Sequence, residues 1–327
     1  MQVGIIGLGN LGTAVGNLLA ENGHDVLGWE HSDAAVVEIN ERHTNERYLP
    51  GIALAPGLRA TSDLAAAFDY GRVVFITIPS VFIERTLGPL RGKINPRVII
   101  VNTAKGIDAQ TGLTSFQMLR QLFPDNRHIM LSGPSVASEF ARHMPTTVVV
   151  AGPDMSDLLQ VSRLLDNDYF RTRFSDDCTG VELGGILKNI YAIGLGMFDG
   201  KNIRSVNFRA VYLTIALEEI ARFGVAMGAT IETFLYLSGI GDLLATSLSE
   251  HSHNRRLGEL LAQGLHLPEI RAEMGVLPEG YNTLQAVLYL AEKQHVSLPL
   301  AKGLWDVIND HYTAERFINL FIKDFVE

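Results

Sequence analysis

The sequence is poor in cysteine and has no long uninterrupted apolar run. Cys178 is the only cysteine among 327 residues, which excludes an intrachain disulfide. A lone cysteine is more often a small core residue than a nucleophile. No apolar run approaches the roughly 18–20 residues of a membrane span, and the N-terminus shows no basic segment followed by a cleavage site. We therefore expect a cytoplasmic protein without a membrane partner.

Positive charge is also scarce, because 27 Lys and Arg face 36 Asp and Glu, for a net charge of -9. This balance argues against nucleic acid as a partner but permits a small anionic substrate in a local cationic pocket. The residues suggest no metal site, and there is no internal repeat. The length suggests two domains.

The first half alternates short apolar runs with helix-length segments. Such runs, apolar on both faces, predict a parallel sheet covered by helices; they are Val3–Ile6, Asp25–Trp29, Arg72–Ile78, Arg97–Val101, His128–Leu131 and Thr146–Ala151. After about Asp177 helical spacing dominates. The prediction is an α/β protein with a Rossmann-type doubly wound parallel sheet over residues 1–178 and an all-helical substrate-binding domain over residues 179–327.

A glycine-rich turn follows the first strand. Gly7, Gly9 and Gly12 form GxGxxG around Asn10 and Leu11, between a strand and a helix. The glycines permit a tight turn, close approach of a pyrophosphate and close helix packing, and the helix N-terminus favours phosphate. An ordinary glycine turn is the alternative. We predict a dinucleotide site.

The second strand ends at Glu30, followed by His31. A carboxylate there accepts hydrogen bonds from both ribose hydroxyls and favours NAD. His31 could instead meet the 2′-phosphate of NADP. We predict NAD, with NADP as the alternative.

Ligands of open α/β sheets bind beyond the carboxyl ends of the strands. Pro79, Lys105, Gly133 and Ser135 each follow a predicted strand. Taken singly, Lys105 could be a solvated loop charge and Gly133 part of a plain turn. Together at one edge, they predict a polar substrate site.

The helical domain contributes further candidates. Lys188 and Asn189 lie within the apolar segment ELGGILKNIYAIGLG, where burial would disfavour the charged lysine and suit it to proton transfer. A lysine that snorkels from a core helix is the alternative. Asp242 and Thr246, four residues apart, would share a helix face, although Asp242 could simply be a helix cap.

Ser252, His253 and Asn254 begin another helix next to two arginines. This start suits a bound phosphate, whereas the simpler interpretation is a capped, solvated helix end.

Together these residues resemble the NAD(P)-dependent glycerol-3-phosphate dehydrogenase family over nearly the whole chain. GVELGGILKN and GPSVASE are its most specific elements, and the others are GLGNLG, NERYLPGIAL, ATSDL, AKGID, MPTTVVVAG, GIGDLLAT and PEGYNT. The resemblance implies reversible NAD(P)H-dependent reduction of dihydroxyacetone phosphate to glycerol 3-phosphate, a precursor of glycerophospholipids.

The resemblance also implies roles for individual residues. Lys188 would be the acid/base, and Lys105 would orient and polarise the substrate. Asn189, Asp242 and Thr246 would surround the hydroxyls and the lysine. Ser252 and Asn254 would hold the phosphate, with His253 beside them. Other contacts to the cofactor would come from Pro79, Lys105, Ala137 and Glu279. Relatives suggest a homodimer.

The chain departs from the family pattern at three places. The family's usual arginine before Asn254 is His253, the glycine turn holds Asn10-Leu11, and the segment after Asp199 reads GKNIRSVNFRA. Arg255, Arg204 or Arg209 could replace the missing phosphate contact. The alternative functions are a related dehydrogenase with another small hydroxy or keto substrate, and a dinucleotide-binding sensor without catalysis.

Overall fold

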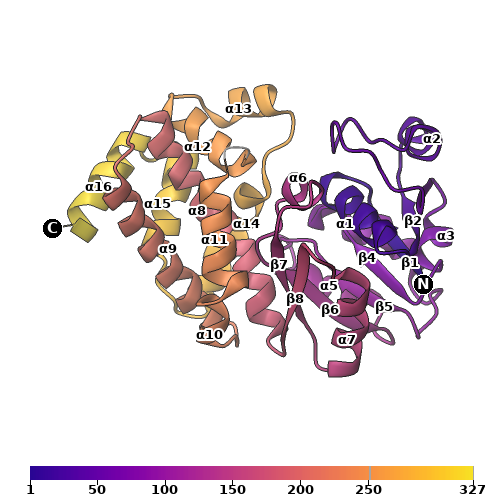
Figure 1. Cartoon of the computed structure of the whole chain (residues 1–327). Helices are drawn as coiled ribbons and strands as arrows, with labels where there is room; N and C mark the ends of the chain where they lie inside the picture. Colours follow the sequence, from indigo (N-terminus) through magenta and orange to yellow (C-terminus); the bar gives the residue numbers. More distant parts are fainter. Residues whose placement is uncertain (250–251, 327) are drawn as a thin grey trace. The chain divides into compact units, whose positions relative to one another are not determined.

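The computed structural model describes residues 1–249 and 252–326 (Figure 1). The chain divides into two compact units. Met1–Lys105 and Leu113–Val181 form the first, and Gly106–Gly112 and Glu182–Glu327 form the second. The predicted domain boundary between residues 178 and 179 stays a prediction, and Glu327 lies outside the described residues.

The first unit contains an eight-stranded sheet in the order β3-β2-β1-β4-β5-β6-β7-β8. The order changes direction between β1 and β4, which is where open α/β sheets bind ligands. The predicted α/β fold is confirmed. The strands are β1 Gln2–Ile6, β2 Asp25–Trp29, β3 Leu58–Thr61, β4 Val73–Ile76, β5 Ile99–Asn102, β6 Arg127–Ser132, β7 Thr146–Ala151 and β8 Phe170–Ser175.

One strand pair departs from the predicted parallel sheet. β6 and β7 are antiparallel, whereas all the other neighbours are parallel. Parallel neighbours need a crossover that usually contains a full helix. Between β6 and β7 the structure has only the short helix α6 Ala137–Phe140, and the chain turns back instead.

Alternate residues of the central strands face opposite layers of helices. Val73 and Phe75 pack in the core that includes α1 and α7. Val74 and Ile76 pack in the core that includes α3, α4 and α5. The sheet is therefore covered on both faces. The bounds are α1 Asn10–Glu21, α2 Asp33–Arg42, α3 Leu64–Phe68, α4 Ile83–Leu87, α5 Ser115–Leu122 and α7 Met155–Leu165, with 3-10 turns η1 Ser80–Phe82 and η2 Gly88–Leu90 around α4.

The described residues of the second unit are helical and contain no strand. α8 Cys178–Gly200 is apolar and long enough to cross a membrane by length and composition alone, but 94% of its apolar window is buried inside the protein, as in a core helix. The other helices are α9 Val206–Ala226, α10 Ile231–Phe234, α11 Asp242–Leu248, α12 His253–Ala262, α13 Leu267–Met274, α14 Glu279–Lys293, α15 Pro299–Ile308 and α16 Ala314–Val326, with a π turn η3 Leu237–Gly241 before α11.

Two glycines let α12 cross α8 at backbone contact. A Cβ at Gly196 would lie 1.9 Å from the carbonyl oxygen of Arg255, and a Cβ at Gly258 would lie 1.9 Å from that of Ile193. No larger side chain fits at either position. This crossing fixes the start of α12 beside the middle of α8.

Candidate functional site

The glycine turn has the shape of a phosphate cradle. Gly7 has φ +105°, and a Cβ at Gly12 would lie 1.9 Å from the carbonyl oxygen of Gly7. A Cβ at Gly9 would meet no atom within 4 Å, so there is open space above the turn. Gly9 precedes α1 and provides no side-chain cap for its first N–H groups. These features fit a pyrophosphate at the helix N-terminus.

The segment NERYLPGIAL holds this turn in place, a role that sequence reasoning missed. The buried Asn45 donates hydrogen bonds to the carbonyl of Leu8 at 2.9 Å and to the hydroxyl of Thr13 at 2.9 Å. Asn10 donates to the carbonyl of Tyr48 at 2.6 Å. Asparagines are ordinary loop residues, so their spacing carries no signal of these contacts.

Glu30 lies at the end of β2 and is 3% exposed. Its Oε1 accepts from the backbone N–H of Ser32 at 3.1 Å and lies 2.7 Å from Nδ1 of the exposed His31. The loop after β2 therefore orients this carboxylate. The preference for NAD stays a prediction.

The remaining candidates of the first unit follow strand ends. Pro79 precedes η1 after β4, and Lys105 is half-buried after β5. The hydroxyl of Ser135 donates to the carbonyl of Gly133 at 3.0 Å after β6. Ala137 opens α6 and is buried.

The second unit brings Lys188 of α8 and Asp242 of α11 together as an ion pair. The Lys188 side chain is 11% exposed and that of Asp242 is 1% exposed. A buried charge needs such a partner. Lys188 therefore does not snorkel to solvent, and Asp242 does more than cap a helix. Thr246 lies one turn further along α11 and is half-buried.

Asn254 connects three helices next to this pair. Its Nδ2 donates to Oδ1 of Asn189 at 3.1 Å, and its Oδ1 accepts from the backbone N–H of Gly280 at 3.0 Å. A Cβ at Gly280 would lie 2.5 Å both from the carbonyl oxygen of Asn189 and from Oδ1 of Asn254. Glu279 opens α14 immediately before this contact. The bridge thus joins α8, α12 and α14.

At the start of α12, Ser252 caps the helix, as the simpler interpretation of this segment predicts. The hydroxyl of Ser252 accepts from the backbone N–H of Arg255 at 3.4 Å. His253 is exposed as the first residue of the helix. The side chain of Arg255 is held by Asp199, at 2.5 Å from Nη2 to Oδ2. The phosphate contacts proposed for this helix start stay predictions.

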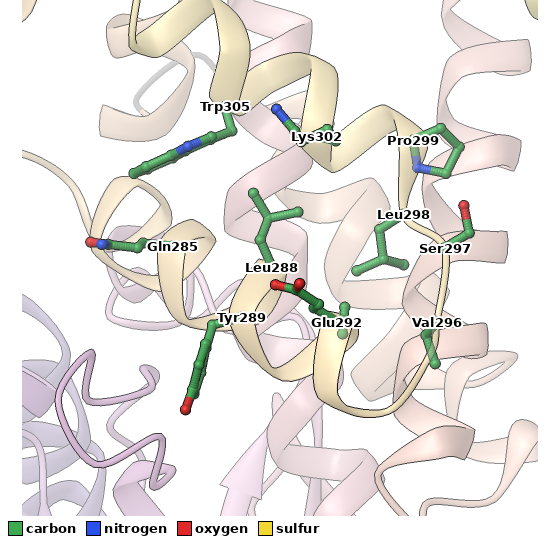
Figure 2. Close-up of a pocket in the computed structure, with 11 residues that line it drawn as sticks. Gln285, Leu288, Tyr289, Glu292, Val296, Ser297, Leu298, Pro299, Lys302 and Trp305 are labelled. Atoms are coloured by element: carbon green, nitrogen blue, oxygen red, sulfur yellow. The ribbon is translucent and has the colours of Figure 1, made fainter.

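A separate hollow of about 550 Å³ lies between α14 and α15 (Figure 2). Aliphatic and aromatic side chains such as Leu288, Tyr289 and Trp305 line it together with Glu292 and Lys302. None of the predicted site residues is among its lining residues. Within the part of the chain that the structure describes, no group of three or more His, Cys, Asp or Glu side chains could hold a metal ion.

Comparison with known proteins covers both units. Residues 2–158 match the family model described as NAD-dependent glycerol-3-phosphate dehydrogenase N-terminus, and residues 177–319 match the one described as its C-terminus. A glycerol-3-phosphate dehydrogenase [NAD(P)+] of Lysinibacillus sphaericus is 39% identical over 94% of this chain and 91% of its own length. That of Enterococcus faecalis is 37% identical over 99% of this chain and 96% of its own length.

A solved structure shows the same similarity. The glycerol-3-phosphate dehydrogenase of Coxiella burnetii is 29% identical, covers 98% of each chain and superimposes with a TM-score of 0.92. The similarity therefore extends over the whole described fold.

Proposed function

The chain belongs to the NAD-dependent glycerol-3-phosphate dehydrogenase family, and from this premise we propose how its own residues carry out the reaction. The protein is an NAD(P)-dependent oxidoreductase that reversibly reduces dihydroxyacetone phosphate to glycerol 3-phosphate. The observation that carries the assignment of roles is the buried ion pair of Lys188 and Asp242.

The nicotinamide cofactor supplies a hydride when it is bound. The open space at Gly9 and the uncapped start of α1 would receive its pyrophosphate, with Asn10 and Leu11 beside it. Glu30 would accept hydrogen bonds from the adenosine ribose, which favours NAD. Glu279, Pro79 and Ala137 complete the proposed cofactor contacts.

Lys188 supplies the proton that the substrate oxygen needs. As the carbonyl carbon gains a hydride, its oxygen gains negative charge, and the Lys188 ammonium stabilises this charge and gives up a proton. The Asp242 carboxylate holds and orients the ammonium through their ion pair. Lys105 adds a second positive charge at the oxygen. Thr246 and Asn189 position the hydroxyl groups.

The phosphate end of the substrate is assigned to the start of α12. Ser252 and Asn254 offer polar groups beside the helix N-terminus, and His253 stands where the family pattern has arginine. Asn254 is already fixed by Asn189 and Gly280, so its amide is oriented before substrate arrives. Gly133 and Ser135 are the proposed substrate contacts of the first unit.

The decisive experiment removes the proposed acid. Lys188→Ala should lower kcat by about 10²–10⁴-fold, the usual contribution of a general acid, while the Kd for NADH stays within about twofold. Lys201→Ala, at an exposed lysine just beyond α8, is the matched control. Retained turnover in the Lys188 variant would refute the role.

Folding must be separated from chemistry, because Lys188→Ala leaves the buried Asp242 without its ammonium. Breaking one side of a buried pair costs about 3–5 kcal/mol. A Lys188→Met/Asp242→Asn double variant removes both charges. It should fold, bind NADH and remain inactive.

We also propose a cytoplasmic homodimer that supplies glycerol 3-phosphate to glycerophospholipid synthesis. Support for the dimer comes from exposed apolar residues at four-residue spacing, namely Tyr236 just before η3, Ile240 on η3, and Leu244 and Leu248 on α11. Contiguous exposed apolar groups are typical of association surfaces. Light scattering on the purified protein measures the mass, and a monomer at micromolar concentration would refute the dimer.

The proposed supply of glycerol 3-phosphate to glycerophospholipid synthesis is tested in cells that lack the enzyme. Growth of these cells without added glycerol would count against the proposed pathway.

A further inference from the structure

A cavity of about 560 Å³ lies in the second unit, apart from the proposed catalytic residues. It is formed by the end of α8, the segment that follows it, the start of α9 and one side of α12. Its lining is almost entirely polar or charged and consists of Asp199, Gly200, Arg204, Arg209, Arg255, Glu259 and Gln263.

Asp199 is the centre of this cavity's charge network. Its Oδ1 lies 2.5 Å from Nη2 of Arg209, and its Oδ2 lies 2.5 Å from Nη2 and 2.9 Å from Nε of Arg255. The three side chains are between 15% and 23% exposed. The network is therefore partly withdrawn from water.

Positive charge exceeds negative charge in this cavity. Three arginines line it, and Asp199 is shared by two of them. The other acidic group, Glu259, lies 3.1 Å from Arg256, which does not line the cavity and also pairs with Glu273 at 2.6 Å. The two partly buried guanidiniums of Arg209 and Arg255 share the single carboxylate of Asp199, and a bound anion would balance the remaining positive charge.

Two arginines retain donors that a ligand could use. Nε of Arg209 donates to the carbonyl of Ile203, and Nη2 donates both to that carbonyl and to Asp199. Arg204 donates from Nε to Oδ1 of Asn202 at 2.9 Å. Across residues 1–249 and 252–326, Nη1 of Arg209 and both Nη atoms of Arg204 have no hydrogen-bond partner. Guanidinium groups with free parallel N–H donors suit phosphate oxygens.

The cavity is too far from Lys188 to hold the phosphate of the same three-carbon substrate. Lys188 and Asp199 lie eleven residues apart on α8, a rise of about 16 Å. Lys188 pairs with Asp242, the first residue of α11. Arg255 instead donates to the carbonyls of Ser247 and Ser249, at the other end of α11. The two ends of α11 lie about 9 Å apart along the helix axis, so this helix also separates Lys188 from Arg255.

We propose that this cavity is a second anion site, which binds a phosphate monoester through Arg204 and Arg209, with the positive charge of Arg255 beside them. Its volume leaves room for a carbon skeleton as well as a phosphate group. Arg255 also holds the end of α11 through its bonds to Ser247 and Ser249. An anion bound beside this guanidinium binds the native state and not the unfolded chain, so it stabilises the second unit against unfolding.

Thermal unfolding with glycerol 2-phosphate tests the site. In glycerol 2-phosphate the central oxygen carries the phosphate, so the molecule has neither a ketone to reduce nor a free secondary alcohol to oxidise. It therefore serves as a probe and not as a substrate. NAD⁺ is present throughout, and dihydroxyacetone phosphate is left out because it is itself a phosphate monoester and would compete for the cavity. At constant ionic strength, the probe should raise the Tm of the wild type in a saturable manner. In Arg204→Gln/Arg209→Gln the apparent Kd should rise at least about tenfold.

The matched control is Arg171→Gln/Arg173→Gln, which makes the same charge change at two exposed arginines of β8. It should respond to the probe as the wild type does. If the double variant at 204 and 209 does not fold, Arg204→Gln alone serves. Arg204 is exposed, and among the described residues its side chain bonds to Asn202 alone. The apparent Kd of this single variant should rise at least about threefold.

Three results would overturn the proposal. One is a wild-type Tm that does not respond to the probe, and another is an unchanged response in the variants at 204 and 209. The third is inorganic phosphate binding as tightly as glycerol 2-phosphate, since this would identify free phosphate as the ligand.

Discussion

Replacing Gly280 by alanine should damage the bridge that holds α8, α12 and α14 together. The added Cβ would lie 2.5 Å from the carbonyl oxygen of Asn189 and 2.5 Å from Oδ1 of Asn254. Both distances are far below van der Waals contact, and one of the atoms is backbone in the middle of a buried helix. Relief therefore requires that α14 moves outward or that Asn254 rotates.

Each route to relief has a cost that can be approximated. Overpacking in a well-packed core costs about 1–3 kcal/mol. Loss of the hydrogen bond from the Gly280 N–H to Asn254, at 3.0 Å, adds about 1 kcal/mol. We expect the free energy of unfolding to fall by about 2–4 kcal/mol. Because Asn254 also positions Asn189 next to Lys188, kcat/KM should fall more than the affinity for NADH.

Urea unfolding followed by circular dichroism measures the stability, and steady-state kinetics measure kcat/KM. The matched control is Gly88→Ala, where the new Cβ would meet only the flexible end of the Glu84 side chain at 3.5 Å. This control should stay within about 1 kcal/mol of the wild type. If Gly280→Ala unfolds at the same urea concentration as the control, α14 accommodates the methyl group and the bridge is not rigid.

Two further predictions concern the charged groups of the second unit. His253→Arg restores a permanently charged fork beside the proposed phosphate contacts and should lower the KM for dihydroxyacetone phosphate by about tenfold; an unchanged KM would exclude position 253 from the phosphate site. Burial raises the pKa of Glu219 above its usual value near 4.5, although Leu300, Ala301 and Tyr191 donate hydrogen bonds to it. Between the unfolded-state pKa near 4.5 and the raised pKa in the native state, the native state binds more protons than the unfolded state. The free energy of unfolding of the wild type, relative to that of Glu219→Gln, should therefore increase as pH falls from 7 toward 4.5. Below pH 4.5 there should be no further increase. Urea midpoints measured at several pH values test this, and a difference independent of pH would contradict it.

Patterns of a few neighbouring residues were enough to predict the fold. The run Arg72–Ile78 contains the strand Val73–Ile76, all four residues of which are buried, because a strand buried on both faces must be apolar throughout. β3 and β8 escaped prediction because they are edge strands in which exposed arginines alternate with buried residues. The direction of β7 also escaped, since direction depends on the length of the connection rather than on the strand itself.

The sequence predicted candidate site residues, but it could not predict which of them meet. Lys188 was conspicuous because its neighbours are apolar, yet its pairing with Asp242 joins residues 54 positions apart. Asn45 and Gly280 are ordinary residue types in loops and helix starts, and only the contacts at Leu8 and Asn254 reveal what they do. Contacts of this kind depend on how helices cross, which no local pattern encodes.

The arginines near α12 show how the same limitation affects inference about the substrate. From the sequence alone, Arg255 is a reasonable replacement for the arginine missing at His253, since it lies two residues away. In the folded chain those two residues turn its side chain toward Asp199 and the end of α11, because successive positions on a helix point about 100° apart. A charge two positions away thus cannot compensate for His253. If the phosphate end of the substrate binds at the helix start as proposed, it is held without the guanidinium of Arg255, which predicts weaker recognition than an arginine at position 253 gives. The positive charge of Arg255 lies instead in a different cavity of the same unit.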